Sequence, residues 1–179
     1  EGDLIYLSKP LGTGYLLAAY FLNSKLLSIS DFETLLTYLK TGNDLAAKSG
    51  FSCGSQLMTD ISGFGLASHL GDICQSSNLS AQIDLRSDIL INTKLEILKN
   101  FKSSGYKSNY SSSINSIDIE DNHPLLNIVF DPQTNGPLLI AIDKEKKDQF
   151  ENSFRNHSLS KPLLIGEFIR QKEKLIYFK

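Results

Sequence analysis

An acidic residue stands before a glycine-rich turn in the stretch MTDISGFGLASHL, residues 58–70. Asp60 precedes Gly63 and Gly65, and an apolar run with helical spacing follows them. A carboxylate is a hard oxygen ligand of the kind that Mg²⁺ takes, with water and phosphate oxygens in its other positions. The two glycines would let the backbone pass close to such a ligand. The alternative is that Asp60 or Ser62 only caps the helix that follows.

A second glycine-rich turn, KPLGTG, occupies residues 9–14 between an expected strand and an expected helix. Free amides at the helix start, flexible glycines and the charge of Lys9 are typical of an anion-binding turn. The structural alternative is that Pro10 ends the strand, the first glycine turns the chain and Thr13 caps the helix. Both interpretations stay open on spacing alone.

The third stretch, FDPQTNGPLL at residues 130–139, has the composition of a hairpin turn. Asp131 and the proline after it are typical of a turn start, and Asn135-Gly136 tolerates positive φ. Pro137 cannot donate to a ladder, so we expect it at the start of a strand or at an edge. No stretch supplies a nucleophile with its base, paired carboxylates or a complete phosphate-binding loop, so we expect no catalytic residue in this chain.

Composition narrows the class of protein. The 179 residues contain 18 Lys and Arg and 20 Asp and Glu, a formal net charge of -2, which indicates neither nucleic acid nor a membrane surface as a partner. Cys53 and Cys74 form no zinc or disulfide pattern, and the three histidines are scattered. No apolar run approaches the roughly 20 residues of a membrane span. Reduced thiols and a cytoplasmic location are the expectation.

Elements that would position these stretches follow from periodicity. We expect strands at 4–7, 79–85, 125–130, 138–142, 162–169 and 174–178, with a short strand or extended link in 54–63. We expect helices at 13–27, from 30 to about 49 with a capping box of Ser30 and Glu33, at 64–76, 87–103 and 144–154, and an exposed loop at 103–116. The last two strands are expected to form a hairpin. This order predicts an α/β fold with a mixed sheet and helices packed on it.

The three stretches together, GDLIYLSKPLGTG, MTDISGFGLASHL and FDPQTNGPLL, resemble the C-terminal half of selenophosphate synthetase, also called selenide, water dikinase. The family patterns read approximately GDxLxLTKPLGTG, TDxTGFGLxGHL and DPQTSGGLL, in the same order. The resemblance covers nearly the whole chain. It implies a three-layer fold like the C-terminal domain of aminoimidazole ribonucleotide synthetase, with a mixed, largely antiparallel sheet flanked by helices.

The resemblance also implies an activity, the ATP-dependent phosphorylation of selenide to selenophosphate with AMP and phosphate as co-products. In that family an N-terminal half carries the reactive Cys or Sec, an essential Lys and most of the groups that hold Mg²⁺ and ATP, and none of those motifs occurs here. We therefore expect residues 1–179 to be a single C-terminal domain of a longer protein, inactive in isolation. The expected partners are ATP, selenide and its own N-terminal domain, in a homodimer.

One ligand carries over by resemblance: Asp60 matches the aspartate of TDxTGFG, a magnesium ligand in the family. Three departures stand against the pattern, namely Ser62 for threonine, Ala67-Ser68-His69 where glycine precedes histidine, and Asn135-Gly136-Pro137 for Ser-Gly-Gly. The last departure removes an amide and stiffens a loop. Two other functions stay open: another ATP-dependent enzyme of the same superfamily, or a non-catalytic module for assembly or ligand sensing.

Overall fold

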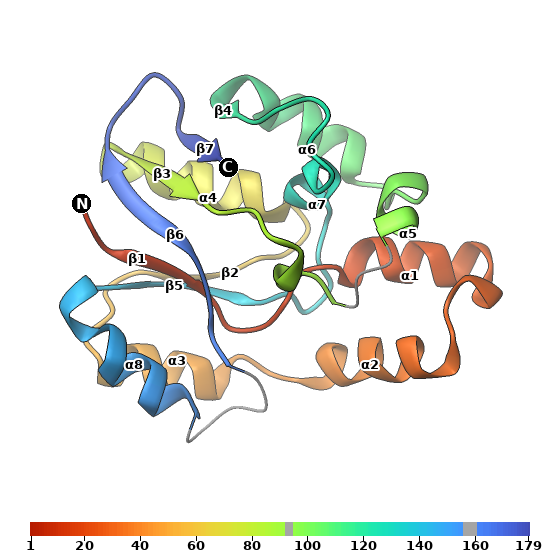
Figure 1. Cartoon of the computed structure of the whole chain (residues 1–179), viewed down its shortest axis with the longest axis horizontal. Helices are drawn as coiled ribbons and strands as arrows, with labels where there is room; N and C mark the ends of the chain where they lie inside the picture. The colour runs from red at the N-terminus through yellow and green to blue at the C-terminus, as the bar shows by residue number, and fades with distance from the viewer. Residues whose placement is uncertain (92–94, 156–160) are drawn as a thin grey trace.

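The computed structural model describes residues 1–91, 95–155 and 161–179, and it is built around one seven-stranded sheet. The strand order is β2-β5-β1-β6-β3-β7-β4 (Figure 1). Their bounds are β1 Leu4–Leu7, β2 Met58–Asp60, β3 Leu79–Ile83, β4 Ile117–Asp118, β5 Leu138–Ile142, β6 Leu163–Arg170 and β7 Ile176–Phe178. β2, β5, β1, β6 and β3 pair antiparallel, whereas β7 runs parallel to β3 and to β4. The expected mixed, largely antiparallel sheet is confirmed.

The central strand β1 shows why this sheet needs helices on both faces. Alternate side chains of a strand point to opposite faces, and all four residues of β1 are buried. Ile5 and Leu7 belong to the larger apolar cluster, and Leu4 and Tyr6 belong to a second cluster on the other face. A strand that buries both faces must be covered twice, so a three-layer arrangement follows from its sequence.

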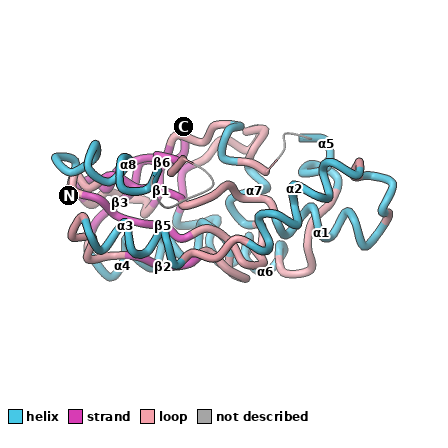
Figure 2. The backbone as a smooth tube through the Cα atoms, turned by 90° about the horizontal axis from the view of Figure 1, so that it is seen from below, coloured by secondary structure: helices cyan, strands magenta, loops and turns pink. Residues whose placement is uncertain are grey.

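Helices supply the two covers. α4 (Gly65–Ser77), α6 (Tyr106–Ser113) and α7 (Leu126–Phe130) pack on the larger cluster, and α3 (Asp44–Ser52) and α8 (Lys147–Arg155) on the second. Figure 2 shows α3 and α8 beside the sheet. α1 (Thr13–Leu22) and α2 (Ile29–Lys40) extend beyond the end of the sheet, on the right of Figure 1. No helix in the described ranges combines the length and apolar character that a membrane crossing requires.

The N-cap of the second helix lies two residues earlier than expected. Ser28, not Ser30, is its N-cap: the Ser28 hydroxyl accepts from the Asp31 amide at 3.2 Å, and the Asp31 carboxylate accepts from the Ser28 amide at 2.9 Å. The capping box of Ser30 and Glu33 was therefore wrong, because two overlapping boxes exist in the sequence and the earlier one forms. The helix ends at Lys40, and α3 is a separate helix.

Three further expectations were wrong. The segment 125–130 is helix α7 and not a strand, so 131–137 joins a helix to β5 instead of closing a hairpin. The expected loop at 103–116 contains helix α6. The last two strands form no hairpin, because β3 lies between β6 and β7 in the sheet.

Other helices are shorter than their patterns. The expected helix 13–27 ends at Leu22 and is followed by a 3₁₀ turn, Ser24–Leu26. In place of the helix 87–103 stand a 3₁₀ turn, Ser87–Ile89, and α5, Leu95–Asn100, and residues 92–94 between them lie outside the described part. The expected strands at 4–7, 79–85, 138–142, 162–169 and 174–178 and helices at 64–76 and 144–154 are confirmed with small shifts of their ends.

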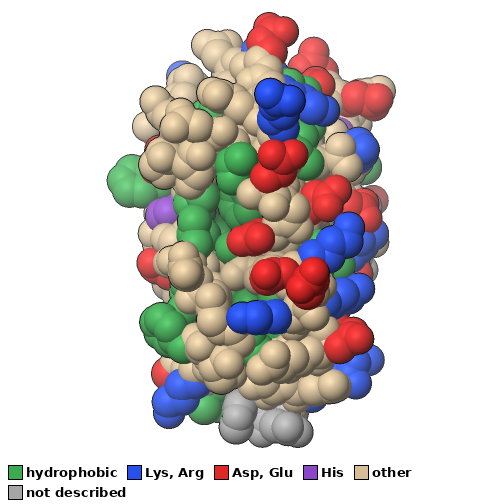
Figure 3. All heavy atoms as spheres, turned by 90° about the vertical axis from the view of Figure 1, so that its left-hand side faces the viewer, with side chains coloured by type: hydrophobic (Ala, Val, Ile, Leu, Met, Phe, Trp, Pro, Cys, Tyr) green, Lys and Arg blue, Asp and Glu red, His purple; other side chains and the backbone are tan. Residues whose placement is uncertain are grey.

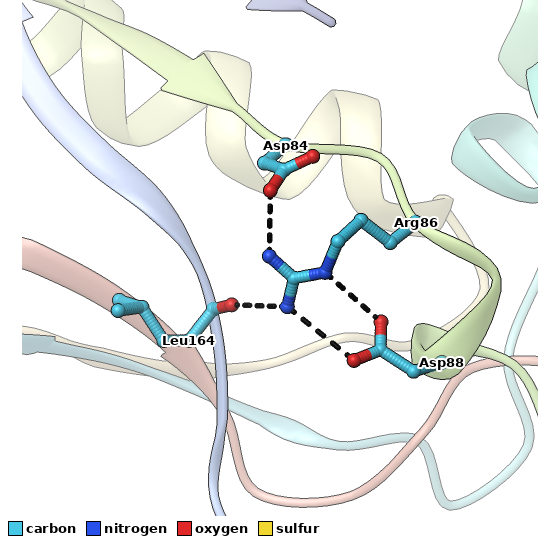
Figure 4. Close-up of polar contacts among 4 residues, drawn as sticks. All are labelled: Asp84, Arg86, Asp88 and Leu164. Atoms are coloured by element: carbon cyan, nitrogen blue, oxygen red, sulfur yellow. Dashed lines mark hydrogen bonds and ion pairs between the residues drawn. The ribbon is translucent and has the colours of Figure 1, made fainter.

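The surface carries mixed charge. Figure 3 shows acidic and basic side chains interspersed on one end of the molecule. An exposed ion-pair cluster fixes the chain after β3 (Figure 4): Arg86 donates to Asp84 at 2.6 Å, to Asp88 at 3.2 Å and to the carbonyl of Leu164 at 3.2 Å. The guanidinium donates to two carboxylates and to a carbonyl of β6, so this cluster has a structural role.

Candidate functional site

The three motifs meet at one end of the sheet. Asp60, the last residue of β2, is paired with Leu138, the first residue of β5. Just past the end of β1, the amide of Ser8 donates to the carbonyl of Leu138 at 2.9 Å. The C-terminal ends of β1 and β2 therefore lie beside the N-terminal end of β5. The three motifs connect to the sheet at this one end.

The first turn is closed by the third motif. Gln133 Oε1 accepts hydrogen bonds from the amides of Gly12 at 2.8 Å and Thr13 at 3.2 Å, and from the Thr13 hydroxyl at 3.2 Å. The Thr13 hydroxyl in turn accepts from the Thr134 amide at 2.9 Å, so it does not cap its own helix. Amides that an anion would need at the start of α1 are thus occupied by a side chain 121 positions further along the chain.

Asp131 completes this closure from a buried position. Its carboxylate is 1% exposed and accepts from the Tyr15 amide at 3.0 Å, the Ser103 hydroxyl at 3.0 Å and Gln133 Nε2 at 2.9 Å. Burial raises the pKa of Asp131 to about 7, and these three donors act against that rise. Asp131 and Gln133 together cap the first turn of α1 from a distance. This supports a structural role for KPLGTG, but the expected cap by Thr13 was wrong.

Lys9 is directed to a helix and not to solvent. Its side chain is 2% exposed, and Nζ donates to the carbonyls of Tyr38 and Thr41 at the end of α2. Burial lowers the pKa of Lys9 to about 8. A cation beside the free carbonyls of a helix C-terminus is favourable, so Lys9 is accounted for by the end of α2.

The departure Asn135-Gly136-Pro137 has an internal explanation. Asn135 adopts φ 45°, which asparagine tolerates well, and its amide donates to the carbonyls of Leu39 and Thr41. A Cβ on Gly136 would lie 2.0 Å from the carbonyl oxygen of Ile61, so only glycine fits there. Pro137 directly precedes β5, as expected. The loop therefore packs against the end of α2 and the turn after β2.

The second turn, after β2, is held by its backbone. The Ile61 amide donates to the Pro137 carbonyl at 2.8 Å, the Gln133 amide donates to the Ser62 carbonyl at 3.0 Å, and the Ser62 amide donates to His69 Nε2 at 3.2 Å. The Ser62 hydroxyl also lies 3.2 Å from the same nitrogen. The hydroxyl retained at position 62 therefore pairs with the histidine of the same motif.

Asp60 stands apart from these contacts within the described part of the chain. Its side chain is exposed, and it makes no hydrogen bond or ion pair with any residue that the structure describes. α4 begins after Phe64, and no side-chain cap is formed there. The alternative in which Asp60 or Ser62 caps this helix is therefore wrong. No three potential metal-ligating side chains gather anywhere in the described ranges, so Asp60 would contribute a single ligand.

The remaining candidate residues that the structure describes have ordinary structural roles. His123 Nδ1 accepts from the Leu125 amide at 3.1 Å, and His157 lies outside the described residues. Cys53 and Cys74 are buried free thiols, and burial raises the pKa of Cys74 to about 12. Thiols buried in this way typically have a packing role.

One residue at this end of the sheet was missed. Asn109 lies on α6, the segment expected to be a loop, and contacts the turn after β2. A signal was present: Tyr106, Tyr110 and Ile114 recur at four-residue spacing, as on one face of a helix. The density of serine and asparagine obscured that spacing.

Comparison with known proteins agrees with the resemblance. Selenide, water dikinase from Shewanella sp. (strain MR-7) is 33% identical over 166 residues, which are 92% of this chain and 46% of that protein. The enzyme of the same name from Treponema denticola is 30% identical over 183 residues, 98% of this chain and 51% of that protein. The chain thus spans about half the length of these curated relatives.

Solved structures share the fold. Thiamine-monophosphate kinase from Stenotrophomonas maltophilia K279a superposes with a TM-score of 0.66 at 17% identity, covering 99% of this chain and 50% of that one. Hydrogenase maturation protein HypE in complex with ATP gives a TM-score of 0.52 at 15% identity, covering 94% and 43%. The family model "AIR synthase related protein, C-terminal domain" matches residues 1–178. The chain belongs to the family of AIR synthase related C-terminal domains.

Proposed function

We propose that this chain is the C-terminal part of a selenophosphate synthetase-like enzyme, which consumes ATP, selenide and water and releases selenophosphate, AMP and phosphate. The proposal rests on the motifs and on relatives named selenide, water dikinase at 30–33% identity. In this proposal Asp60 is a ligand to Mg²⁺ associated with ATP, and a further domain supplies the nucleophile and most contacts to the nucleotide. The chain contributes a fixed acidic turn.

The observation that carries this proposal is the contrast between Asp60 and the backbone beneath it. Ile61 and Ser62 are held by hydrogen bonds to Pro137, Gln133 and His69, whereas the Asp60 carboxylate is exposed and unpartnered among the described residues. A rigid main chain that presents an unpaired charge has its binding group preorganised.

The residues present fit a shared magnesium ion. Mg²⁺ is commonly held by one or two carboxylates, with water and substrate phosphates completing its octahedron, so a single exposed aspartate is an adequate contribution. When bound, the metal would neutralise phosphate charge during phosphoryl transfer. The contribution of this chain would be one anionic oxygen, on a turn whose backbone is held by Pro137, Gln133 and His69.

The decisive experiment replaces Asp60 in the full-length protein that carries this chain. Asp60→Asn keeps the shape and removes the charge, and we expect selenide-dependent ATP consumption to fall by roughly 100-fold or more. The melting temperature should change little, because the carboxylate has no partner in the described structure to lose. Asp72→Asn is the matched control: Asp72 is also exposed and lies on α4, away from the turn.

The outcomes separate the functions. Turnover near the parent level in Asp60→Asn would remove Asp60 from the metal site. ATP consumption that does not depend on selenide would favour another acceptor within the superfamily, and no consumption by the full-length protein would favour a non-catalytic module. The isolated chain is expected to fold and to consume no ATP, since it lacks the nucleophile-bearing motifs.

A further inference from the structure

Helix α6 is the element that turns a serine-rich segment into part of the candidate site. Tyr106 and Tyr110 pack against Phe130, with ring centroids 6.1 and 5.0 Å away. The Ser113 hydroxyl lies 2.9 Å from that of Ser68 on α4. These contacts bury one face of α6 and carry Asn109, 5% exposed, into the space between two motifs.

Both amide hydrogens of Asn109 are used, and each is used on a different motif. Nδ2 donates to the carbonyl of Gly63 at 2.9 Å and to the carbonyl of Phe130 at 3.0 Å. Carbonyl oxygens only accept, so the orientation of this amide is fixed by its two partners. Asn109 therefore joins the turn after β2 to the residue that precedes Asp131.

Gly63 is the point in the turn that most needs such a tie. The hydrogen bonds at Ile61 and Ser62 fix the near side of the turn, and nothing in the described structure lies within 4 Å of a Cβ built on Gly63. A glycine peptide without packing on its open side has wide conformational freedom. The bond from Asn109 removes that freedom at the Gly63 carbonyl.

We infer that Asn109 is a positioning residue for the turn that presents Asp60. Its side-chain amide fixes the Gly63 peptide, and through it the far side of the acidic turn. This inference rests on the proposed function for its effect on magnesium, whereas its effect on the turn stands on geometry alone. Partners behind a metal ligand typically change metal affinity by roughly 10–100-fold when they are lost.

The test compares two asparagines in the full-length protein. Asn109→Ala removes both ties to the motifs. Asn127→Ala is the matched control, because Asn127 also makes two side-chain hydrogen bonds in the same helical cluster, accepting from Tyr106 and donating to the Leu98 carbonyl. If Asn109→Ala does not fold, Asn109→Ser keeps one donor and takes its place.

Two readouts are required, hydrogen exchange of the 61–65 amides and the Mg²⁺ concentration that gives half-maximal ATP consumption. We expect Asn109→Ala to accelerate exchange at Ile61, Ser62 and Gly65 and to raise the half-saturating Mg²⁺ roughly tenfold. Asn127→Ala should do neither. Unchanged exchange in Asn109→Ala, or equal changes in both variants, would overturn the inference.

The same experiment distinguishes the two proposals. If Asp60→Asn leaves the magnesium response unchanged, the metal role of Asp60 fails, and Asn109 is then judged by exchange alone. If Asp60→Asn raises the magnesium requirement but Asn109→Ala does not, the proposed function stands and Asn109 is not a positioning residue.

Discussion

Two glycine-rich turns lead from a strand into a helix at the same end of this sheet, and they differ in whether side chains cap the helix. The turn before α1 is filled, meaning that its backbone amides are taken: Gln133 and Asp131 accept from Gly12, Thr13 and Tyr15. The turn before α4 has a tied backbone, but no side chain caps its helix and its acid is unpaired among the described residues. A similar local sequence therefore has a different role according to what a distant segment places against it.

The difference also separates buried from exposed polar groups. Asp131 and Gln133 are 1% and 5% exposed and have their hydrogen-bonding capacity met inside the protein, whereas Asp60 faces solvent. Buried polar groups are costly unless they are satisfied, so the first turn is committed to stability. The second turn instead exposes a charged group, Asp60, which the proposed function assigns to Mg²⁺.

The largest expected contrast comes from one glycine in each turn. A Cβ on Gly14 would lie 1.8 Å from the Pro132 carbonyl oxygen, so Gly14→Ala should destabilise the fold by roughly 3 kcal/mol although alanine favours helices. Gly63→Ala meets nothing within 4 Å and should change stability by less than about 0.5 kcal/mol. Urea unfolding monitored by far-UV circular dichroism measures both.

Activity of the full-length protein sharpens this contrast. We expect Gly63→Ala to reduce ATP consumption without loss of stability, because the added methyl group stands on the open side of the acidic turn. Equal destabilisation by the two alanines would contradict the distinction between a filled and an open turn.

An intermediate effect is expected from the titration of Asp131. An unfolded aspartate has a pKa near 3.9, and burial raises the folded value to about 7, so between these values the folded state binds more protons than the unfolded state. This contribution to stability is complete below pH about 4 and is lost as pH rises to about 7, by at most about 1.4 kcal/mol per pH unit. The measurement is unfolding free energy against pH.

Asp131→Asn removes this titration, so the difference in slope between the variant and the parent protein isolates it. A parent stability that instead increases over this window, relative to the variant, would mean that the three donors around Asp131 outweigh its burial. The filled turn would then be held by a carboxylate in its charged form.

A smaller effect than at Gly14 or Asp131 is expected at the Arg86 cluster. The Arg86 side chain is 45% exposed, and both aspartates are 58% exposed, so solvent and salt screen their ion pairs. Arg86→Gln should cost less than about 1 kcal/mol, with a difference that shrinks as salt is added. A loss as large as that of Gly14→Ala would show that exposed charge matters as much as the buried turn.

The sequence predicted strands well where apolar residues form a buried run, as in Leu4–Leu7 and Leu138–Ile142. It failed at residues 125–130, because five or six apolar residues are too few to distinguish a strand from a buried helix. It failed again at 106–113, where packing of Tyr106 and Tyr110 on Phe130 overrides a serine-rich composition. Tertiary contacts decided both segments, and local patterns do not contain them.

In the candidate site, too, local features could be predicted from the sequence and contacts between distant segments could not. Asp60 and the glycines around it could be singled out because they lie in one short motif, and the metal role of Asp60 stays a prediction. The occupation of the first turn by Gln133, the pairing of Lys9 with the end of α2 and the reach of Asn109 were not found, because each joins segments far apart in the chain. Spacing along a sequence carries no information about such pairs.

The distant cap on α1 has a consequence for the order in which the protein is made. The first strand lies between β5 and β6, and the first helix takes its cap from residues 131 and 133. During synthesis, the opening third of the chain must leave the ribosome with its central strand unpaired and that helix start uncapped. Contacts this far apart make folding slow, so the exposed early segments are where a chaperone would be needed.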